Sequence, residues 1–205
     1  MLLLTDEIEL KKLEAQLHSR LTPLLDSGIR LKVVETIAST NAALKSQALM
    51  SNQTLLLARE QTAGVGRRGS LWQSPPAGNL YLSYCVHSGR PLNELSLWSL
   101  GVTVAVADAL QRVLSLDCKI KWPNDLYLQG MKVGGVLLET TRLTGDNVAV
   151  VIGIGLNVAS HPDPKLLRRP VTCISKHTDR SVDLPMVAAL VAAAVVEMCR
   201  LSHAV

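Results

Sequence analysis

A glycine–arginine loop at residues 64–72 constrains the fold of this chain more than any other segment, and it reads G-V-G-R-R-G-S-L-W. Its glycines spell G-x-G-x-x-G, the pattern of dinucleotide-binding turns, but such a turn needs a helix that begins at the last glycine. Pro75 and Pro76 follow too closely to allow a normal helix. The segment therefore argues against a dinucleotide-binding βαβ unit and predicts a loop between two strands.

The chemistry of this loop favours an anionic ligand. Its glycines let the backbone approach a ligand closely, and Arg67 and Arg68 place two cations side by side. An ordinary solvated basic turn explains the same residues equally well. The loop alone leaves both interpretations open.

Hydrophobic periodicity and turn residues predict alternating strands and helices along the rest of the chain. A short helix is expected after Ser39 or Thr40, and Asn93 is expected to cap a long one. The predicted strands are residues 31–36, 54–58, 79–86, 119–122, 126–128, 133–141 and 148–158, and the longer helices are 6–20, 95–114 and 184–201. This order predicts an α+β fold with a mostly antiparallel mixed sheet and helices packed on one face. No repeat or linker divides the chain, so one domain over residues 1–205 is expected.

Composition narrows the class of protein. Apolar residues make up 48% of the 205 residues and phenylalanine is absent, so an aliphatic core is expected. The net charge of +4 suits phosphate-bearing substrates, nucleic acid or no special partner. The four cysteines show no C-x-x-C or zinc spacing, which favours reduced thiols. Residues 1–4 look like the start of a signal peptide, but acidic residues follow at once, which argues against one. The apolar stretch 184–196 is too short to span a bilayer, so a cytoplasmic protein is expected.

Three further motifs accompany the loop. They are A-S-T-N at residues 38–41, K-W-P-N-D at 121–125 followed by K-V-G-G at 132–135, and I-G-I-G-L-N-V at 152–158. With the loop they resemble the biotin–protein ligases, or biotin–[acetyl-CoA-carboxylase] ligases, of the biotin/lipoate protein ligase superfamily. The resemblance extends over roughly residues 30 to 160 and implies a catalytic domain like that of class II aminoacyl-tRNA synthetases. The helix-turn-helix and β-barrel domains of fuller members are not evident.

The resemblance implies an enzyme that uses ATP to convert biotin to biotinyl-5'-AMP and then biotinylates a lysine of a biotin carboxyl carrier protein. ATP and biotin are then substrates, Mg²⁺ accompanies them, and no tightly bound prosthetic group is expected. The partner is the carrier domain of acetyl-CoA carboxylase or another biotin-dependent enzyme, without DNA or membrane, and a homodimer is compatible. The alternatives are a lipoate or octanoate ligase or transferase, and a degenerate protein that binds biotin without catalysis.

The same resemblance assigns site residues. Arg67 and Lys121 are the expected catalytic cations. The expected biotin-binding residues are Ser39, Thr40, Asn41, Gln61, Gly64, Val65, Gly66, Arg67, Lys121, Gly153 and Gly155. The expected ATP- and adenylate-binding residues are Arg67, Arg68, Trp72, Asn124, Lys132 and Asn157, and Asp125 is a candidate metal ligand through water.

Several of these assignments have a structural alternative. Ser39 or Thr40 can serve as a helix cap, and Lys121 and Lys132 can be solvated lysines at a strand end and a hairpin. Asp125 can cap a turn and Trp72 can belong to the core. The loop also departs from the family pattern G-R-G-R-x-G-R-x-W, because Val65 and Ser70 stand where arginines are usual. We therefore expect weaker retention of the adenylate.

Overall fold

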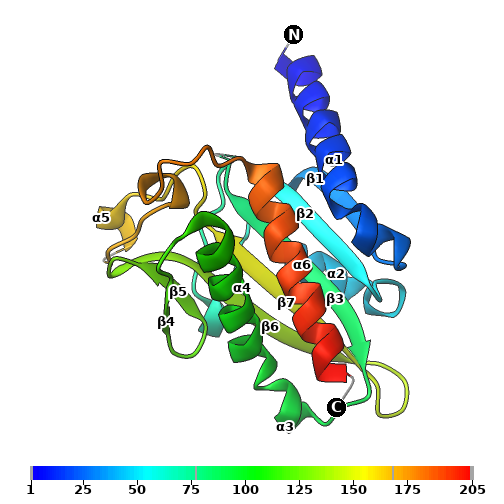
Figure 1. Ribbon diagram of the computed structural model, residues 1–205. Helices are drawn as coiled ribbons and strands as arrows, with labels where there is room; N and C mark the ends of the chain where they lie inside the picture. The colour runs from blue at the N-terminus through cyan, green and yellow to red at the C-terminus, as the bar shows by residue number, and fades with distance from the viewer. Residues whose placement is uncertain (1, 77, 168, 204–205) are drawn as a thin grey trace.

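The computed structural model describes residues 2–76, 78–167 and 169–203 (Figure 1). Its centre is a seven-stranded sheet in the order β1-β2-β3-β7-β6-β5-β4. The strands are β1 Arg30–Ile37, β2 Thr54–Gln61, β3 Leu80–Ser88, β4 Lys119–Lys121, β5 Asp125–Leu128, β6 Met131–Arg142 and β7 Val148–Leu156. β1 and β2 are parallel, whereas the other neighbouring strands are antiparallel. The mostly antiparallel mixed sheet is thus confirmed.

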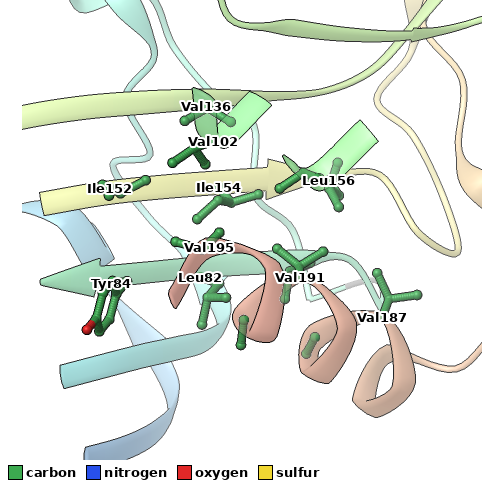
Figure 2. Close-up of a cluster of buried hydrophobic side chains, with 14 of the residues drawn as sticks. Leu82, Tyr84, Val102, Val136, Ile152, Ile154, Leu156, Val187, Val191 and Val195 are labelled. Carbon is green, nitrogen blue, oxygen red and sulfur yellow. The ribbon is translucent and has the colours of Figure 1, made fainter. Parts of the chain in front are cut away.

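Three long helices cover one face of this sheet, α1 Leu2–Asp26, α4 Trp98–Leu114 and α6 Leu184–His203 (Figure 1). Figure 2 shows Val187, Val191 and Val195 of α6 beside Leu82 and Ile154 of the central strands. These aliphatic side chains belong to one continuous buried cluster, as the composition predicted. Burial of such side chains supplies most of the driving force for folding.

A short helix, α2 Thr40–Ser46, packs on the opposite face of the sheet. Its Leu44 contacts a separate small cluster that includes Cys85 and Val151. Side chains alternate between the faces of a strand, so Val151 on the α2 face lies next to Ile152 on the helix-covered face. The long helices therefore gather on one face as expected, while α2 leaves the other face partly open.

Several element boundaries differ from those predicted. Asn93 does not cap the long helix, because it lies inside α3 Leu92–Leu95, and α4 begins separately at Trp98 without a side-chain cap. The first helix is longer than residues 6–20, and β4 and β7 end at Lys121 and Leu156 rather than at residues 122 and 158. Ser39 does cap α2, since its Oγ accepts a hydrogen bond from Ala42 N at 3.3 Å. The minor elements are α5 Pro164–Leu167 and 3-10 turns at Ala48–Met50, Arg67–Gly69 and Ile174–Lys176.

Two helical stretches, Leu92–Leu114 and Leu184–Ser202, are long and apolar enough to cross a membrane by length and composition alone. The expectation that the second is too short is therefore wrong, because the helix continues beyond residue 196. Both stretches pack on the sheet, and their apolar residues such as Val102 and Val191 are fully buried there. Core packing accounts for the buried apolar residues of the two stretches, whereas Leu97, Val104 and Leu201 are exposed.

Candidate functional site

A cavity of about 200 Å³ opens on the α2 face of the sheet, between α2 and the glycine–arginine loop. Most of the expected site residues meet there. Those that line it are Ser39, Thr40, Asn41, Gln61, Val65, Gly66, Arg67, Trp72, Asn124, Asp125, Lys132, Gly153 and Gly155. Gly64, Arg68, Lys121 and Asn157, which the structure also describes, do not line it. The four sequence motifs therefore converge on one cavity.

Strand β7 makes room for the cavity by alternation. Ile152, Ile154 and Leu156 point into the helix-covered core, whereas Gly153 and Gly155 lie at the intervening positions (Figure 2). A Cβ atom at Gly153 would lie 2.3 Å from Asn41 Oδ1, and one at Gly155 would lie 2.5 Å from the Trp72 ring. The glycines thus admit two protein side chains close to the strand, which is a more specific requirement than the close ligand approach expected from the sequence.

One end of the cavity is a network of neutral polar groups. Gln61 Oε1 accepts hydrogen bonds from Thr40 N at 2.9 Å and Thr40 Oγ1 at 3.0 Å. Ser83 Oγ lies 2.6 Å from Asn41 Oδ1 and 2.7 Å from Thr40 Oγ1. Thr40, Asn41 and Ser83 are buried, so these contacts fix the amide and hydroxyl orientations in advance of any ligand.

Glu139 fixes the Asn41 amide from behind, a role the sequence analysis missed. Its Oε2 accepts a hydrogen bond from Asn41 Nδ2 at 2.9 Å, and its Oε1 accepts one from Lys45 Nζ at 2.6 Å. Burial alone would raise the pKa of Glu139, but the hydrogen bonds from Lys45 and Asn41 and the Lys45 charge outweigh burial and lower that pKa. Glu139 therefore stays ionised near neutral pH, and the donor end of the Asn41 amide points towards it.

The sequence resemblance implies biotin as the ligand of this cavity, and on that expectation Glu139→Gln should lower biotin affinity by about fivefold, the value of one net hydrogen bond of roughly 1 kcal/mol. The substituted amide keeps an acceptor oxygen at only one of the two positions and places an NH2 group at the other. Either Asn41 or Lys45 then loses its acceptor, and the Asn41 amide is no longer held in one orientation. Calorimetric titration with biotin measures the effect. The matched control is Glu35→Gln, which removes a carboxylate paired with Arg59 at 3.1 Å outside the cavity. Equal biotin affinity in both variants would remove Glu139 from the positioning role.

The cavity lining also contains cations, and Lys132 is the most buried of them. Its Nζ lies 2.5 Å from Asp125 Oδ1 and 5.5 Å from the centre of the Trp72 ring. The residue is 7% exposed. Burial lowers the pKa of Lys132, and the charges of Arg169 and Lys121 act in the same direction against Asp125. A cation held in this way binds an incoming anion with little competition from water.

Lys121, the expected catalytic lysine, lies outside the cavity lining. It ends β4 at the edge of the sheet and is exposed, with its Nζ 5.6 Å from the centre of the Tyr127 ring. The K-W-P-N-D motif reaches the cavity through Asn124 and Asp125 instead. Asn124 is buried and its Nδ2 donates to Val136 O, which ties the motif to β6. Of these two lysines, Lys132 lines the cavity and Lys121 does not.

The glycine–arginine loop is a closed hairpin with a 3-10 turn, which confirms a loop between β2 and β3. Gly66 N donates to Ser70 O at 2.7 Å, and Trp72 N donates to Gly64 O at 2.9 Å. A Cβ atom at Gly64 would lie 2.4 Å from Trp72 O, so glycine is required there for packing. Arg67 lines the cavity, whereas Arg68 has a φ of 55° and is exposed outside it.

The exposed loop arginines should be sensitive to trypsin, and bound ligands should protect them. An anion at the cavity engages Arg67 and restricts the turn that a protease must open. We expect biotin with ATP to slow cleavage after Arg67 and Arg68 by at least about fivefold, the effect of roughly 1 kcal/mol of added local stability. Cleavage sites are read by mass spectrometry, with Arg112 on α4 as the internal reference. Equal protection at Arg112 and the loop would contradict a local effect.

A second residue missed by the sequence analysis is Arg169. It lines the main cavity and also a smaller adjoining cavity that Trp72, Lys132 and Asn157 share. Of the described side chains, Trp72 Nε1 and Arg169 Nε are buried nitrogen atoms without a hydrogen-bond partner. No motif contains Arg169, so the sequence offered no signal beyond its positive charge.

Asn157 holds the segment that carries Arg169. Its Nδ2 donates to Thr172 O at 2.9 Å, and Ile174 N donates to Asn157 O at 2.9 Å. Lys132 N donates in turn to Pro170 O at 3.0 Å. Asn157 therefore acts first as a structural tie, and it borders the smaller cavity rather than the main one.

Comparisons with known proteins agree with this geometry. The family described as "Biotin/lipoate A/B protein ligase family" matches residues 33–157. The bifunctional ligase/repressor BirA of Escherichia coli is 40% identical over 138 residues, 66% of this chain and 42% of that protein. The biotin–[acetyl-CoA-carboxylase] ligase of Paracoccus denitrificans is 39% identical over 155 residues, 71% of this chain and 62% of that protein.

A solved structure shares the fold as well. The biotin protein ligase of Aquifex aeolicus in complex with biotin and ATP superposes with a TM-score of 0.71 and 31% identity, over 85% of this chain and 72% of that one. In the two sequence comparisons, this chain aligns with less than two thirds of the length of each relative. The family match covers more than half of the chain and includes the loop, the K-W-P-N-D motif and both cavity glycines. The chain therefore belongs to the biotin/lipoate A/B protein ligase family.

Proposed function

We propose that this chain activates biotin with ATP and transfers the biotinyl group to a lysine of a biotin carboxyl carrier protein. One observation carries the proposal: a single cavity is lined both by the neutral hydrogen-bonding network of Thr40, Asn41 and Gln61 and by the cations Arg67 and Lys132. Biotin has a neutral ureido ring at one end and a carboxylate at the other. The names of the relatives and the biotin and ATP complex of the Aquifex aeolicus protein support the same assignment.

The proposed first step needs no protein nucleophile. The carboxylate of biotin attacks the α-phosphate of ATP, an oxygen–phosphorus bond forms, and pyrophosphate leaves with biotinyl-5'-AMP remaining. Two anions must approach each other, so the protein's contribution is to hold them in place and neutralise their charge. Lys132 and Arg67 supply that charge, and Trp72 and Asn124 border the position of the adenylate. Lys121 then acts at longer range, as one of the charges that lower the pKa of Lys132.

The proposed second step uses the acceptor's own chemistry. The amine of the carrier lysine attacks the biotinyl carbonyl, an amide forms, and AMP leaves. The partner is the carrier domain of acetyl-CoA carboxylase or of another biotin-dependent enzyme, met in the cytoplasm. Residues 1–205 serve as one catalytic domain in this scheme. The relatives are longer than the region that they share with this chain, so their full activity is assigned to this chain as a proposal.

Magnesium enters this scheme as the counter-ion of ATP. Within the described parts of the chain, no group of three or more His, Cys, Asp or Glu side chains is placed to hold a metal ion. Asp125 lines the cavity, but one of its oxygens accepts a hydrogen bond from Lys132. Mg²⁺ commonly binds through one or two carboxylates, water and substrate phosphates, so contact between Asp125 and the ion through water fits this donor set.

The polar end of the cavity favours biotin over lipoate or octanoate, because those acids carry an apolar group where biotin carries its ureido ring. The test is ATP-dependent release of pyrophosphate with each acid separately. We expect release with biotin at a rate at least about tenfold above that with the others, since unpaired polar groups in a site discriminate strongly. Faster release with lipoate or octanoate would overturn the substrate assignment. Tight biotin binding without pyrophosphate release would instead favour a degenerate binding protein.

A further inference from the structure

We propose that Arg169 is a phosphate-binding residue of this site and supplies its third cation from the segment after β7. The inference rests on the proposed function, because it assigns a residue to the nucleotide half of that cavity. Its ligand is the phosphate chain of a nucleoside triphosphate, and afterwards the phosphate of the adenylate. The observations that carry it are the position of Arg169 in both cavities and the state of its guanidinium.

The guanidinium of Arg169 is incompletely paired within the protein. Its Nε is buried and has no hydrogen-bond partner, although buried nitrogen donors in folded proteins are nearly always paired. Arginine presents its donors in a planar fork that matches phosphate oxygens. A buried donor of this kind beside a cavity is what a bound phosphate oxygen would satisfy.

Backbone contacts hold Arg169 next to Lys132. Lys132 N donates to Pro170 O at 3.0 Å, and Thr172 N donates to Lys132 O at 2.9 Å. The residue that follows Arg169 is therefore tied to the strand that carries Lys132. The Arg169 charge also helps to lower the pKa of Lys132, as expected for two cations held close together. An anion between them would relieve this repulsion.

The position of Arg169 separates it from the end that would read the ureido ring. The smaller cavity contains Trp72, Asn157 and Arg169 but none of Thr40, Asn41 and Gln61. Across the main cavity the basic residues are Arg67, Lys132 and Arg169, and the acidic one is Asp125. Lys132 is already paired with Asp125, and Arg67 is exposed on the loop. Arg169 is therefore a partly buried cation. In the contacts described, no carboxylate of the lining is paired with it.

The test compares Arg169→Gln and Arg169→Lys with the wild type. Arg112→Gln is the control, because Arg112 is exposed on α4 and pairs with Asp108 away from the cavity. ATP binding is measured without biotin, biotin binding without ATP, and kcat and KM for ATP from pyrophosphate release. Melting curves check that each variant is folded.

We expect Arg169→Gln to weaken ATP binding by about tenfold or more, as for loss of a charge-assisted hydrogen bond, and Arg169→Lys to recover part of it. Biotin affinity without ATP should stay within about twofold of wild type, and Arg112→Gln should match wild type. ATP binding unchanged in Arg169→Gln, or biotin affinity reduced as much as ATP affinity, overturns the inference. A wild type that binds ATP but releases no pyrophosphate with biotin contradicts the proposed function alone, because the ATP-binding comparison still decides Arg169.

Discussion

Lys132→Ala is expected to lower the rate of biotin-dependent pyrophosphate release by about 10- to 100-fold. Lys132 is the most buried cation of the cavity, and its Nζ is held 2.5 Å from Asp125 Oδ1. A hydrogen bond to a charged group is worth roughly 1.5–3 kcal/mol, which corresponds to this range of rates. The variant also leaves the Asp125 carboxylate without the cation that pairs with it, at a place where anions must bind. Initial rates at saturating biotin and ATP measure the effect.

Lys121→Ala is the comparison variant that distinguishes the role of Lys132 from that of Lys121. Lys121 lies in the K-W-P-N-D motif and Lys132 in the K-V-G-G motif that follows it. Lys121 is exposed at the sheet edge and contacts Tyr127, so its loss should slow the reaction much less than the loss of Lys132. Both variants remove one lysine from the same hairpin region. A larger loss of rate in Lys121→Ala than in Lys132→Ala would contradict the assignment of Lys132 as the principal cation.

Gly153→Ala is expected to weaken biotin binding by about 30-fold. The added methyl carbon would lie 2.3 Å from Asn41 Oδ1, a separation that cannot persist. Glu139 holds the nitrogen of the Asn41 amide, and Ser83 lies 2.6 Å from its oxygen, so Asn41 must break these hydrogen bonds to move. Two net hydrogen bonds of about 1 kcal/mol each correspond to this change in affinity.

Gly101→Ala is the matched control for that substitution. Its added methyl would meet Met198 Sδ at 3.2 Å, and a methionine side chain can move aside at little cost. Biotin affinity and melting temperature are measured for both variants. We expect Gly101→Ala to bind biotin like the wild type and Gly153→Ala to remain folded with weakened binding. Unchanged biotin affinity in Gly153→Ala would show that Asn41 does not contact the ligand.

The location of the site could be predicted from the sequence because its residues lie in local motifs. The paired prolines restrict the backbone, and the glycines of the loop and of β7 leave room for close approach of other groups. Both features can be recognised in a short segment of sequence. Alternation along β7 also predicts that Gly153 and Gly155 share a face. In the structure, residues from all four motifs line one cavity.

The ranking of the two lysines could not be predicted locally. Lys132 is the second residue of β6, next to a hairpin turn, where a lysine would be solvated. The distant segment around Pro170 and Thr172 packs along it and buries it. The β5–β6 register also shifts between Leu126 and Tyr127, which changes which side chains face the cavity. Tertiary contacts of this kind leave no periodic signal in the sequence.

Tertiary contacts also explain why the roles of three further residues could not be predicted, namely Glu139, Arg169 and Asn93. Glu139 reads as an ordinary strand residue, and its partners Asn41 and Lys45 lie almost a hundred positions earlier in the chain. Arg169 belongs to an irregular segment without a motif. Asparagine is a residue type that often caps helices. Asn93, however, lies inside α3, a separate short helix that follows Pro91 and precedes α4. In each case the deciding contact comes from another part of the fold.

We propose that biotinyl-5'-AMP forms in one cavity and that the biotinyl group is transferred from there to a carrier lysine. The most direct measurement is the intact mass of a biotin carboxyl carrier domain after incubation with this chain, biotin and ATP with Mg²⁺. We expect addition of one biotinyl group at the acceptor lysine, no addition without ATP, and no addition when that lysine is replaced by arginine. A carrier domain of unchanged mass, together with no release of pyrophosphate, would contradict the account.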